Sequence, residues 1–171
     1  AWKNLHEYLP PAELTAQHTL LPFTLGLNGQ GDFACACLEP AVLIKSGTTV
    51  AHQLANKWIS SSPFSIWEGS VGNYDRLPTA EFIAEIPKAW DEKRVLGESE
   101  LGKQLWVARR SGEDWYLAGI NGEQSAKQLS LALAFLGPAY YQATLLMDDA
   151  ANAPLARRSE RVLSKSETLA D

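Results

Sequence analysis

The sequence predicts an α+β fold, in which a short helical segment precedes a β-sandwich-like module of antiparallel strands. Two alternating segments joined by a polar turn, at residues 104–120, indicate a β-hairpin. Further alternating segments follow residue 128, and an apolar stripe at helical spacing between residues 48 and 60 indicates a helix ahead of the sheet. We therefore expect residues 1–75 to form loops and helix, and residues 76–171 to form the sheet module.

The clearest helix is expected at Thr48–Ser60. Residues 46–49 (SGTT) supply hydroxyl groups of the kind that cap helix N-termini, and Val50, Leu54 and Trp58 recur at the spacing of one helix face.

A second, short helix is expected between Pro78 and Pro87. Thr79 is its predicted N-cap, and Phe82 and Ile83 lie on its apolar face.

The hairpin has two arms of matched pattern, and a short strand precedes it. Residues 104–109 place successive side chains on opposite faces, residues 111–114 (SGED) form the turn, and residues 115–120 (WYLAGI) return the chain.

More strands are expected beyond the hairpin. Residues 128–133 and 140–147 alternate, with a turn at Gly137-Pro138 between them. A polar loop at 148–154 then leads to a weak edge strand at 161–164, and this spacing of short strands is typical of a β-sandwich.

The tryptophans divide into two groups. Trp90, Trp106 and Trp115 belong to the strand segments, where packing within the core is the expected role. Trp67 lies in a polar loop after a helix, so we expect it to be the most exposed and treat it as the candidate for stacking on a sugar.

The charge of the chain argues against two classes of partner. A formal net charge of −5 disfavours nucleic acid and anionic membrane surfaces. Arg109-Arg110 and Arg157-Arg158 are local basic spots, for which we expect solvated sheet edges or ion pairs. No apolar run approaches the ~20 residues that span a membrane.

Cysteine and histidine do not suggest a metal site. The chain has only Cys35 and Cys37, two positions apart, where a bridge between them would be strained, so two small apolar fillers are expected rather than a disulfide. His6, His18 and His52 are not at zinc-binding spacing.

Several motifs resemble one enzyme family. Residues 87–96 (PKAWDEKRVL) and 107–119 (VARRSGEDWYLAG) are similar to a run and a hairpin in the C-terminal region of glycoside hydrolase family 97, which contains α-glucosidases and α-galactosidases. Residues 19–24 (TLLPFT) and 73–74 (NY) resemble further motifs of the same family.

The resemblance implies a place within a longer architecture. Family members have an N-terminal β-sandwich, a (β/α)8 barrel and a C-terminal β-module, so residues 1–75 would be a remnant of the barrel end and residues 76–171 the C-terminal module. The chain would then cover the last quarter of a member. Members bind calcium, although we expect this chain itself to hold no cofactor. Most members are bacterial and exported, which implies a periplasmic or secreted protein.

The resemblance also indicates where chemistry is missing. Glycoside hydrolysis uses two carboxyl groups on either side of the scissile bond. Glu7 matches the general acid of the family, which also lies near the calcium, but a preceding Glu of that motif falls on Ala1. Leu25 replaces the arginine of another motif, and residues 31–35 depart from the family run. We therefore expect the chain to be unable to hydrolyse glycosides by itself.

Two other acidic groups allow an ion-binding alternative. Asp91-Glu92 and the loop with Asp148, Asp149 and Asn152 carry oxygen ligands, but neither has the spacing of a known calcium loop. We expect the side chains of both groups to be solvated and to bind no ion.

Three functional hypotheses follow. The first is a C-terminal piece of a family 97-like glycosidase that is inert alone, and the second is a non-enzymatic derivative that self-associates or binds a carbohydrate or protein. The third is glycosidase activity completed by another chain. We expect a homo-oligomer, because the apolar stripe of the helix at Thr48–Ser60 lacks most of the barrel that would cover it.

Overall fold

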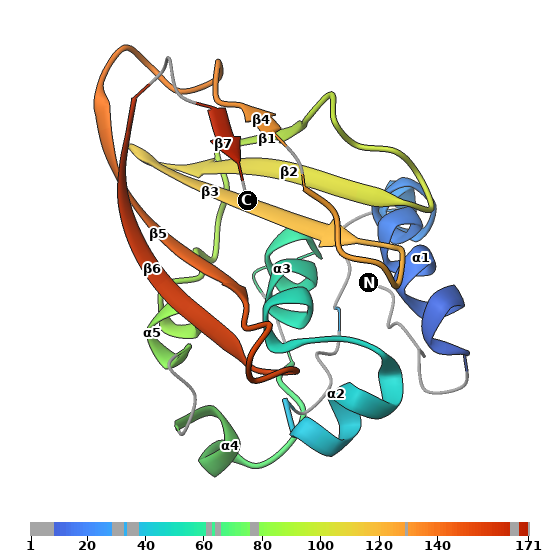
Figure 1. The fold of residues 1–171 in the computed structure, drawn as a ribbon. Coiled ribbons are helices and arrows are strands. Elements are labelled where there is room, and N and C mark those ends of the chain that lie inside the picture. Colours follow the sequence, from blue (N-terminus) through green and yellow to red (C-terminus); the bar gives the residue numbers. More distant parts are fainter. Residues whose placement is uncertain are drawn as a thin grey trace.

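The computed structural model describes residues 9–28, 33, 38–60, 63, 66–75, 79–128, 130–164 and 168–170. Helices occupy one side of the molecule (Figure 1). The strands run through its middle and along the other side. The helical elements are α1 (Pro11–Leu20), η1 (Leu21–Phe23), η2 (Leu25–Asn28), α2 (Pro40–Ser46), α3 (Val50–Ser60), α4 (Val71–Asp75) and α5 (Ala80–Ala84). The strands are β1 (Glu92–Val95), β2 (Gln104–Ser111), β3 (Asp114–Asn121), β4 (Ser130–Ala132), β5 (Tyr140–Asp148), β6 (Ala156–Ser164) and β7 (Thr168–Ala170).

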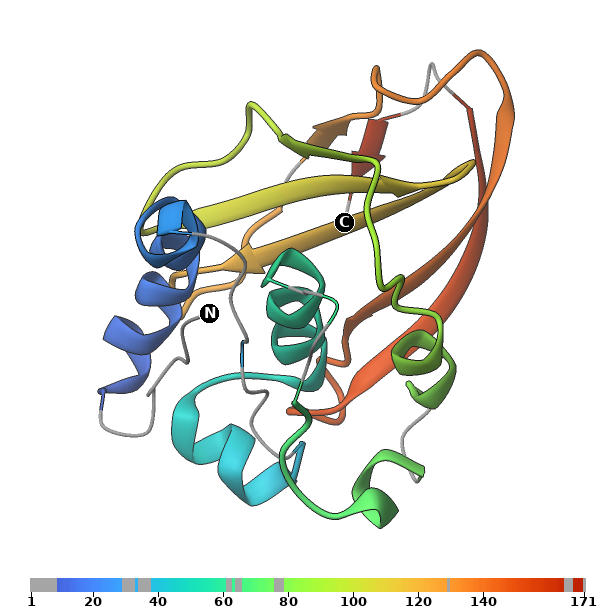
Figure 2. The same cartoon turned by 180° about the vertical axis from the view of Figure 1, so that it is seen from behind.

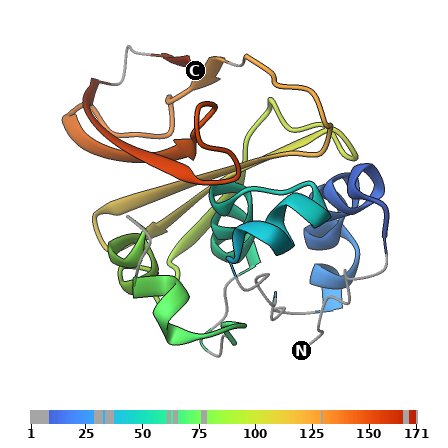
Figure 3. The ribbon, with the colours of Figure 1, turned by 60° about the horizontal axis from the view of Figure 1, so that its bottom comes forward.

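The strands form three small antiparallel sheets. Their orders are β1-β2-β3, β4-β7 and β5-β6. The first sheet lies between the helices and the β4-β7 pair, while β5 and β6 run along one flank of the molecule (Figures 2 and 3). The predicted fold class, helices followed by a module of antiparallel strands, is confirmed.

The predicted hairpin is formed by β2 and β3 in the expected register. Trp106 lies opposite Gly119, and Ser111 lies opposite Asp114 across a two-residue turn. Gly112 is the first residue of this turn and has a φ of 62°. Glycine adopts this left-handed conformation without the steric strain that a Cβ atom would cause.

Helix α3 confirms the predicted helix and explains why the core is shared between distant segments. Val50 and Leu54 belong to an apolar cluster with α2 and β6, and Ile59 belongs to a second cluster beneath the hairpin. Leu105 and Ile120 complete that second cluster from β2 and β3. The expectation that the stripe of this helix is left uncovered is wrong, because strands of the same chain bury it.

The second predicted helix is shorter than expected. Helix α5 ends at Ala84, before Pro87, and Thr79 precedes it without a capping hydrogen bond from its side chain. Phe82 is buried and its ring stacks on Trp58, with centroids 5.8 Å apart. Packing against α3, more than a capping interaction, therefore accounts for the position of this helix.

The strands predicted beyond the hairpin are present, but two of them differ in length and a further one, β7, was not predicted. Strand β4 spans Ser130–Ala132 instead of residues 128–133. Strand β6 begins at Ala156, five residues earlier than the pattern indicated. Residues 157–161 (RRSER) are all polar, so this part of the strand has no apolar periodicity to detect. The loop predicted at 148–154 connects β5 to β6.

The tryptophans of the strand module pack against other side chains. Trp90 meets the ring of Tyr116 edge to face at 5.2 Å, and Trp115 meets Phe135 at 4.9 Å. Residues before and after position 75 share the two core clusters. The division at 75/76 itself stays a prediction, since residues 76–78 lie outside the described part of the chain.

Candidate functional site

Of the two predicted site residues, only Trp67 falls within the described residues. Glu7, predicted from the resemblance as general acid and calcium ligand, lies outside them, and so do Cys35 and Cys37. The two roles expected of Glu7, general acid and calcium ligand, therefore stay predictions.

Trp67 is half-buried rather than exposed. Its ring packs against the apolar cluster around Leu54, meets the ring of Tyr74 edge to face at 5.7 Å, and lies 5.1 Å from the Nζ atom of Lys57. These contacts cover part of the ring. Its role in substrate binding stays a prediction.

Lys57 is a buried cation that the sequence did not reveal. It is 1% exposed, and Nζ donates hydrogen bonds to the carbonyl oxygens of Phe33 at 2.7 Å and Ile66 at 2.6 Å. An ammonium group on α3 therefore holds two segments that lie before and after the helix. The sequence contains one sign of this burial, because the helical periodicity of α3 places Lys57 on the side of the helix that faces the protein interior.

A buried polar cluster joins α1 to α3. His18 Nδ1 lies 2.8 Å from His52 Nε2 and 3.1 Å from Asn56 Nδ2. Because the Asn56 amide nitrogen can only donate, His18 Nδ1 accepts, and His52 Nε2 is then a donor. Burial lowers the pKa of His52 to about 4, so the ring is neutral near pH 7. The i, i+4 spacing of His52 and Asn56 on one helix was the available signal.

The acidic groups considered as ion sites already have partners. Asp91 and Glu92 pair with Arg110 at 3.5 Å, and the Asp149 carboxylate accepts hydrogen bonds from Ala151 N and Asn152 Nδ2. Within the ranges that the structure describes, no group of three or more His, Cys, Asp or Glu side chains is placed to hold a metal ion.

The two arginines of the hairpin differ, and one of them corrects the sequence-based expectation. Arg110 is an ion-pair partner as predicted, but Arg109 is buried at 7% exposure. Its Nη1 donates to the carbonyl oxygen of Trp58 at 2.7 Å, and its guanidinium lies 4.1 Å from the ring centroid of Trp90. Burial lowers the pKa of Arg109 to about 10. It therefore joins the sheet to α3 instead of facing solvent.

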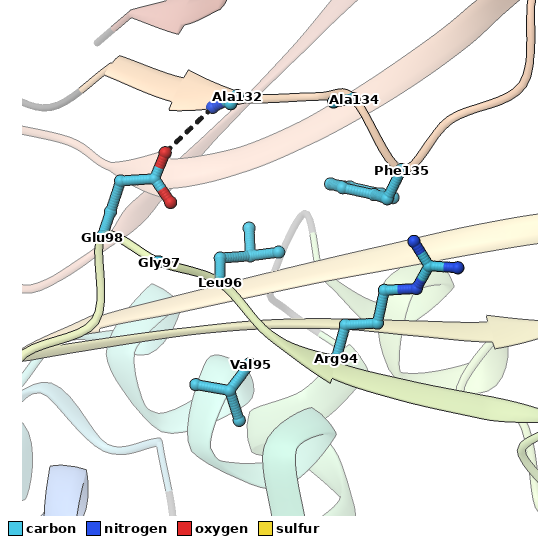
Figure 4. A pocket seen from close by; sticks show the side chains of 8 residues that line it. All are labelled: Arg94, Val95, Leu96, Gly97, Glu98, Ala132, Ala134 and Phe135. Atoms are coloured by element: carbon cyan, nitrogen blue, oxygen red, sulfur yellow. Dashed lines mark hydrogen bonds between the residues drawn. The ribbon is translucent and has the colours of Figure 1, made fainter.

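An open pocket lies between the β1 end of the first sheet and the segment after β4 (Figure 4). It has a volume of about 580 Å³, and its lining residues are Arg94, Val95, Leu96, Gly97, Glu98, Ala132, Ala134 and Phe135.

The polar side chains of this pocket are engaged within the protein. Glu98 accepts a hydrogen bond from Ala132 N at 3.1 Å, and Arg94 pairs with Glu92 and lies 5.3 Å from the ring of Trp115. Glu98 is the one carboxylate in the lining, whereas glycoside hydrolysis uses two.

No helix within the described residues is long and apolar enough to cross a membrane.

The C-terminal half of the chain matches a described protein family. Residues 89–170 match the sequence model of the family described as "Glycosyl-hydrolase 97 C-terminal, oligomerisation".

Two curated relatives share nearly a third of their aligned residues with this chain. A "Retaining alpha-galactosidase" of Bacteroides thetaiotaomicron is 32% identical over 150 residues, which cover 81% of this chain and 22% of that protein. A "Probable retaining alpha-galactosidase" of Streptomyces bingchenggensis is 32% identical over 107 residues, covering 61% of this chain and 16% of its own length. The chain therefore spans about a fifth of the length of these relatives.

Solved structures share the fold. A glycoside hydrolase family 97 enzyme from Pseudoalteromonas sp. strain K8, solved with acarbose, superposes with a TM-score of 0.78 at 25% identity, covering 91% of this chain and 26% of that one. A β-arabinopyranosidase superposes with a TM-score of 0.77 at 24% identity over 94% of this chain and 26% of its own.

Proposed function

This chain belongs to glycoside hydrolase family 97, where it corresponds to the C-terminal portion, and we propose that it is a self-associating structural module that does not hydrolyse glycosides by itself. The observation that carries the proposal is the match of residues 89–170 to a region described by its role in oligomerisation. A homo-oligomer is the simplest assembly of that kind.

The arrangement of carboxylates supports the non-catalytic part of the proposal. A glycosidase needs a protonated and an ionised carboxyl group about 5–10 Å apart across the scissile bond. In the part of the chain that the structure describes, the pocket beside β1 offers Glu98 alone, and Glu98 is hydrogen-bonded to Ala132 N. A site of this composition does not stabilise the transition state of glycoside hydrolysis.

The calcium of the parent family finds no ligand set among the described residues. The one residue that the resemblance assigns to calcium, Glu7, lies outside them, and the acidic side chains near β1 and after β5 bind Arg110 and loop amides.

The alternative is glycosidase activity completed by a second chain, and Glu7 is the residue that favours it. Assays with aryl α-galactosides and aryl α-glucosides, with and without calcium, distinguish the two functions. We expect no release of the aryl group above the buffer rate. Release that disappears in Glu7→Gln would establish the alternative.

A further inference from the structure

Strands β5 and β6 form a two-stranded ribbon along one flank of the molecule (Figures 1 and 2). Nine residue pairs join them, from Tyr140 opposite Ser164 to Asp148 opposite Ala156. Among the described strands, neither pairs with a third. Two-stranded ribbons are marginally stable in water unless another layer covers a face.

One end of the ribbon is covered by the chain itself. Ala156 is buried, Leu146 packs against the same apolar cluster, and Pro154 accepts a hydrogen bond from Val50 N at 2.9 Å. Arg158 is paired with Glu81 of α5. These contacts attach the ribbon to the helices near the β5-β6 turn.

The other end of the same side is open. We call it the ribbon face, and it consists of the exposed residues Tyr140, Gln142, Thr144, Glu160 and Val162. These side chains lie on one side because Gln142 is opposite Val162 and Thr144 is opposite Glu160, with alternate residues pointing the same way.

The ribbon face carries the most exposed large apolar side chains of residues 89–170, the region that matches the family model. Tyr140 is 82% exposed and Val162 is 68% exposed, the two highest values among the large apolar residues that the structure describes between positions 89 and 170. They lie diagonally across the two strands, at a separation that side chains on one sheet face can bridge. The comparably exposed Leu27, Ile44 and Val71 precede the matched region.

The charge on the ribbon face does not oppose self-contact. Its one ionisable carboxylate, Glu160, lies 3.1 Å from Arg158 Nη2, so a second copy would not meet an unpaired anion. An isologous contact brings the same residues together from both copies, and a face of tyrosine, valine and neutral polar groups is compatible with that arrangement.

We propose that the ribbon face is the surface through which this chain binds a second copy of itself. The inference rests on the proposed function, because the occupant is a second copy only if the module self-associates. Burial of Tyr140 and Val162 against the partner would supply the covering layer that the two-stranded ribbon lacks.

The test compares two variants on the ribbon face with two controls elsewhere. Tyr140→Asp and Val162→Asp each place a charge in the proposed contact, whereas Val71→Asp on α4 and Leu101→Asp in the β1-β2 connection alter apolar side chains that are 74% and 55% exposed. Light scattering over a range of concentrations gives the mass of each. We expect at least a tenfold weaker association for the two ribbon variants and an unchanged mass for the two controls.

Hydrogen exchange on the unaltered chain provides a second test that does not depend on variant folding. Residues 140–144 and 160–163 should gain protection as concentration rises, while the amides of α4 should not. Association unaffected in both ribbon variants, or protection elsewhere only, would overturn the ribbon face and leave the proposed function intact. A wild-type chain that stays monomeric would overturn both.

Discussion

Gly119 shows at the level of one residue how tightly the hairpin is packed. An added Cβ would lie 2.0 Å from Cζ3 of Trp106, the residue directly opposite on β2. We expect Gly119→Ala to lower the free energy of unfolding by ~1–3 kcal/mol, since the indole must move or the strands must separate. Chemical denaturation measures the loss.

The matched control is Gly97→Ala. An added Cβ at Gly97 meets no atom within 4 Å, so the stability should change by no more than ~0.5 kcal/mol. Equal denaturation midpoints for the two variants would contradict the packing described for Trp106.

His52 gives a pH dependence whose sign follows from its surroundings. Its pKa is about 4 in the folded chain and 6.5 in the unfolded chain, so between these values the unfolded chain binds a proton that the folded chain does not. The contribution to stability is complete above pH 6.5 and is lost as the pH falls to about 4. We expect a loss of roughly 1–3 kcal/mol over this window.

His52→Gln separates this effect from the titration of carboxylates. The glutamine amide keeps a donor for His18 Nδ1 but does not titrate. Denaturation curves at several pH values should therefore show a shallower dependence for the variant. An identical dependence in both proteins would exclude His52 as its source.

At the scale of elements, Arg109 is the polar link between the hairpin and α3. Arg109→Ala removes the hydrogen bond to Trp58 O and the contact with the Trp90 ring, and leaves space in the interior. We expect a loss of ~2–4 kcal/mol in unfolding free energy. The neighbouring variant Arg110→Ala removes half-exposed ion pairs with Asp91 and Glu92 and should cost no more than ~1 kcal/mol. Similar losses in both variants would contradict the buried role of Arg109.

The elements also show what periodicity can and cannot predict. Alternation assigned the side chains of the hairpin to two faces, because side chains on a strand change faces at every residue, and the turn predicted at residues 111–114 fixed the pairing of the two arms. Alternation did not distinguish Arg109 from Arg110, since burial of a cation depends on Trp58 and Trp90, which come from other elements. The beginning of β6 was missed for a related reason, because an exposed polar strand has no apolar pattern to detect.

At the scale of the whole molecule, the sequence motifs predicted the family, and periodicity predicted α3, α5 and the strands β1 to β6 in order. Helices α1, α2 and α4 and strand β7 were not predicted. The motifs and the periodicity did not predict what covers α3, because the apolar stripe of a helix specifies a partner surface without naming the element that supplies it. The hairpin of the same chain supplies that surface through Leu105 and Ile120. The contact between His18 and His52 was missed since the two residues are 34 positions apart in sequence and lie on different helices.

Self-association of this chain has to use a surface other than the apolar stripe of α3. The apolar stripe of α3 does not require a second copy to cover it, since Val50, Leu54 and Ile59 are buried within the chain. The match of residues 89–170 to a family region described by oligomerisation supports the homo-oligomer, and Tyr140 and Val162 supply exposed apolar surface within that region.

The measurement that tests the central claim most directly is the mass of the chain in solution. Light scattering at micromolar concentration should give at least twice the chain mass of 18.7 kDa, falling toward that value on dilution. A constant 18.7 kDa at every concentration would contradict the account.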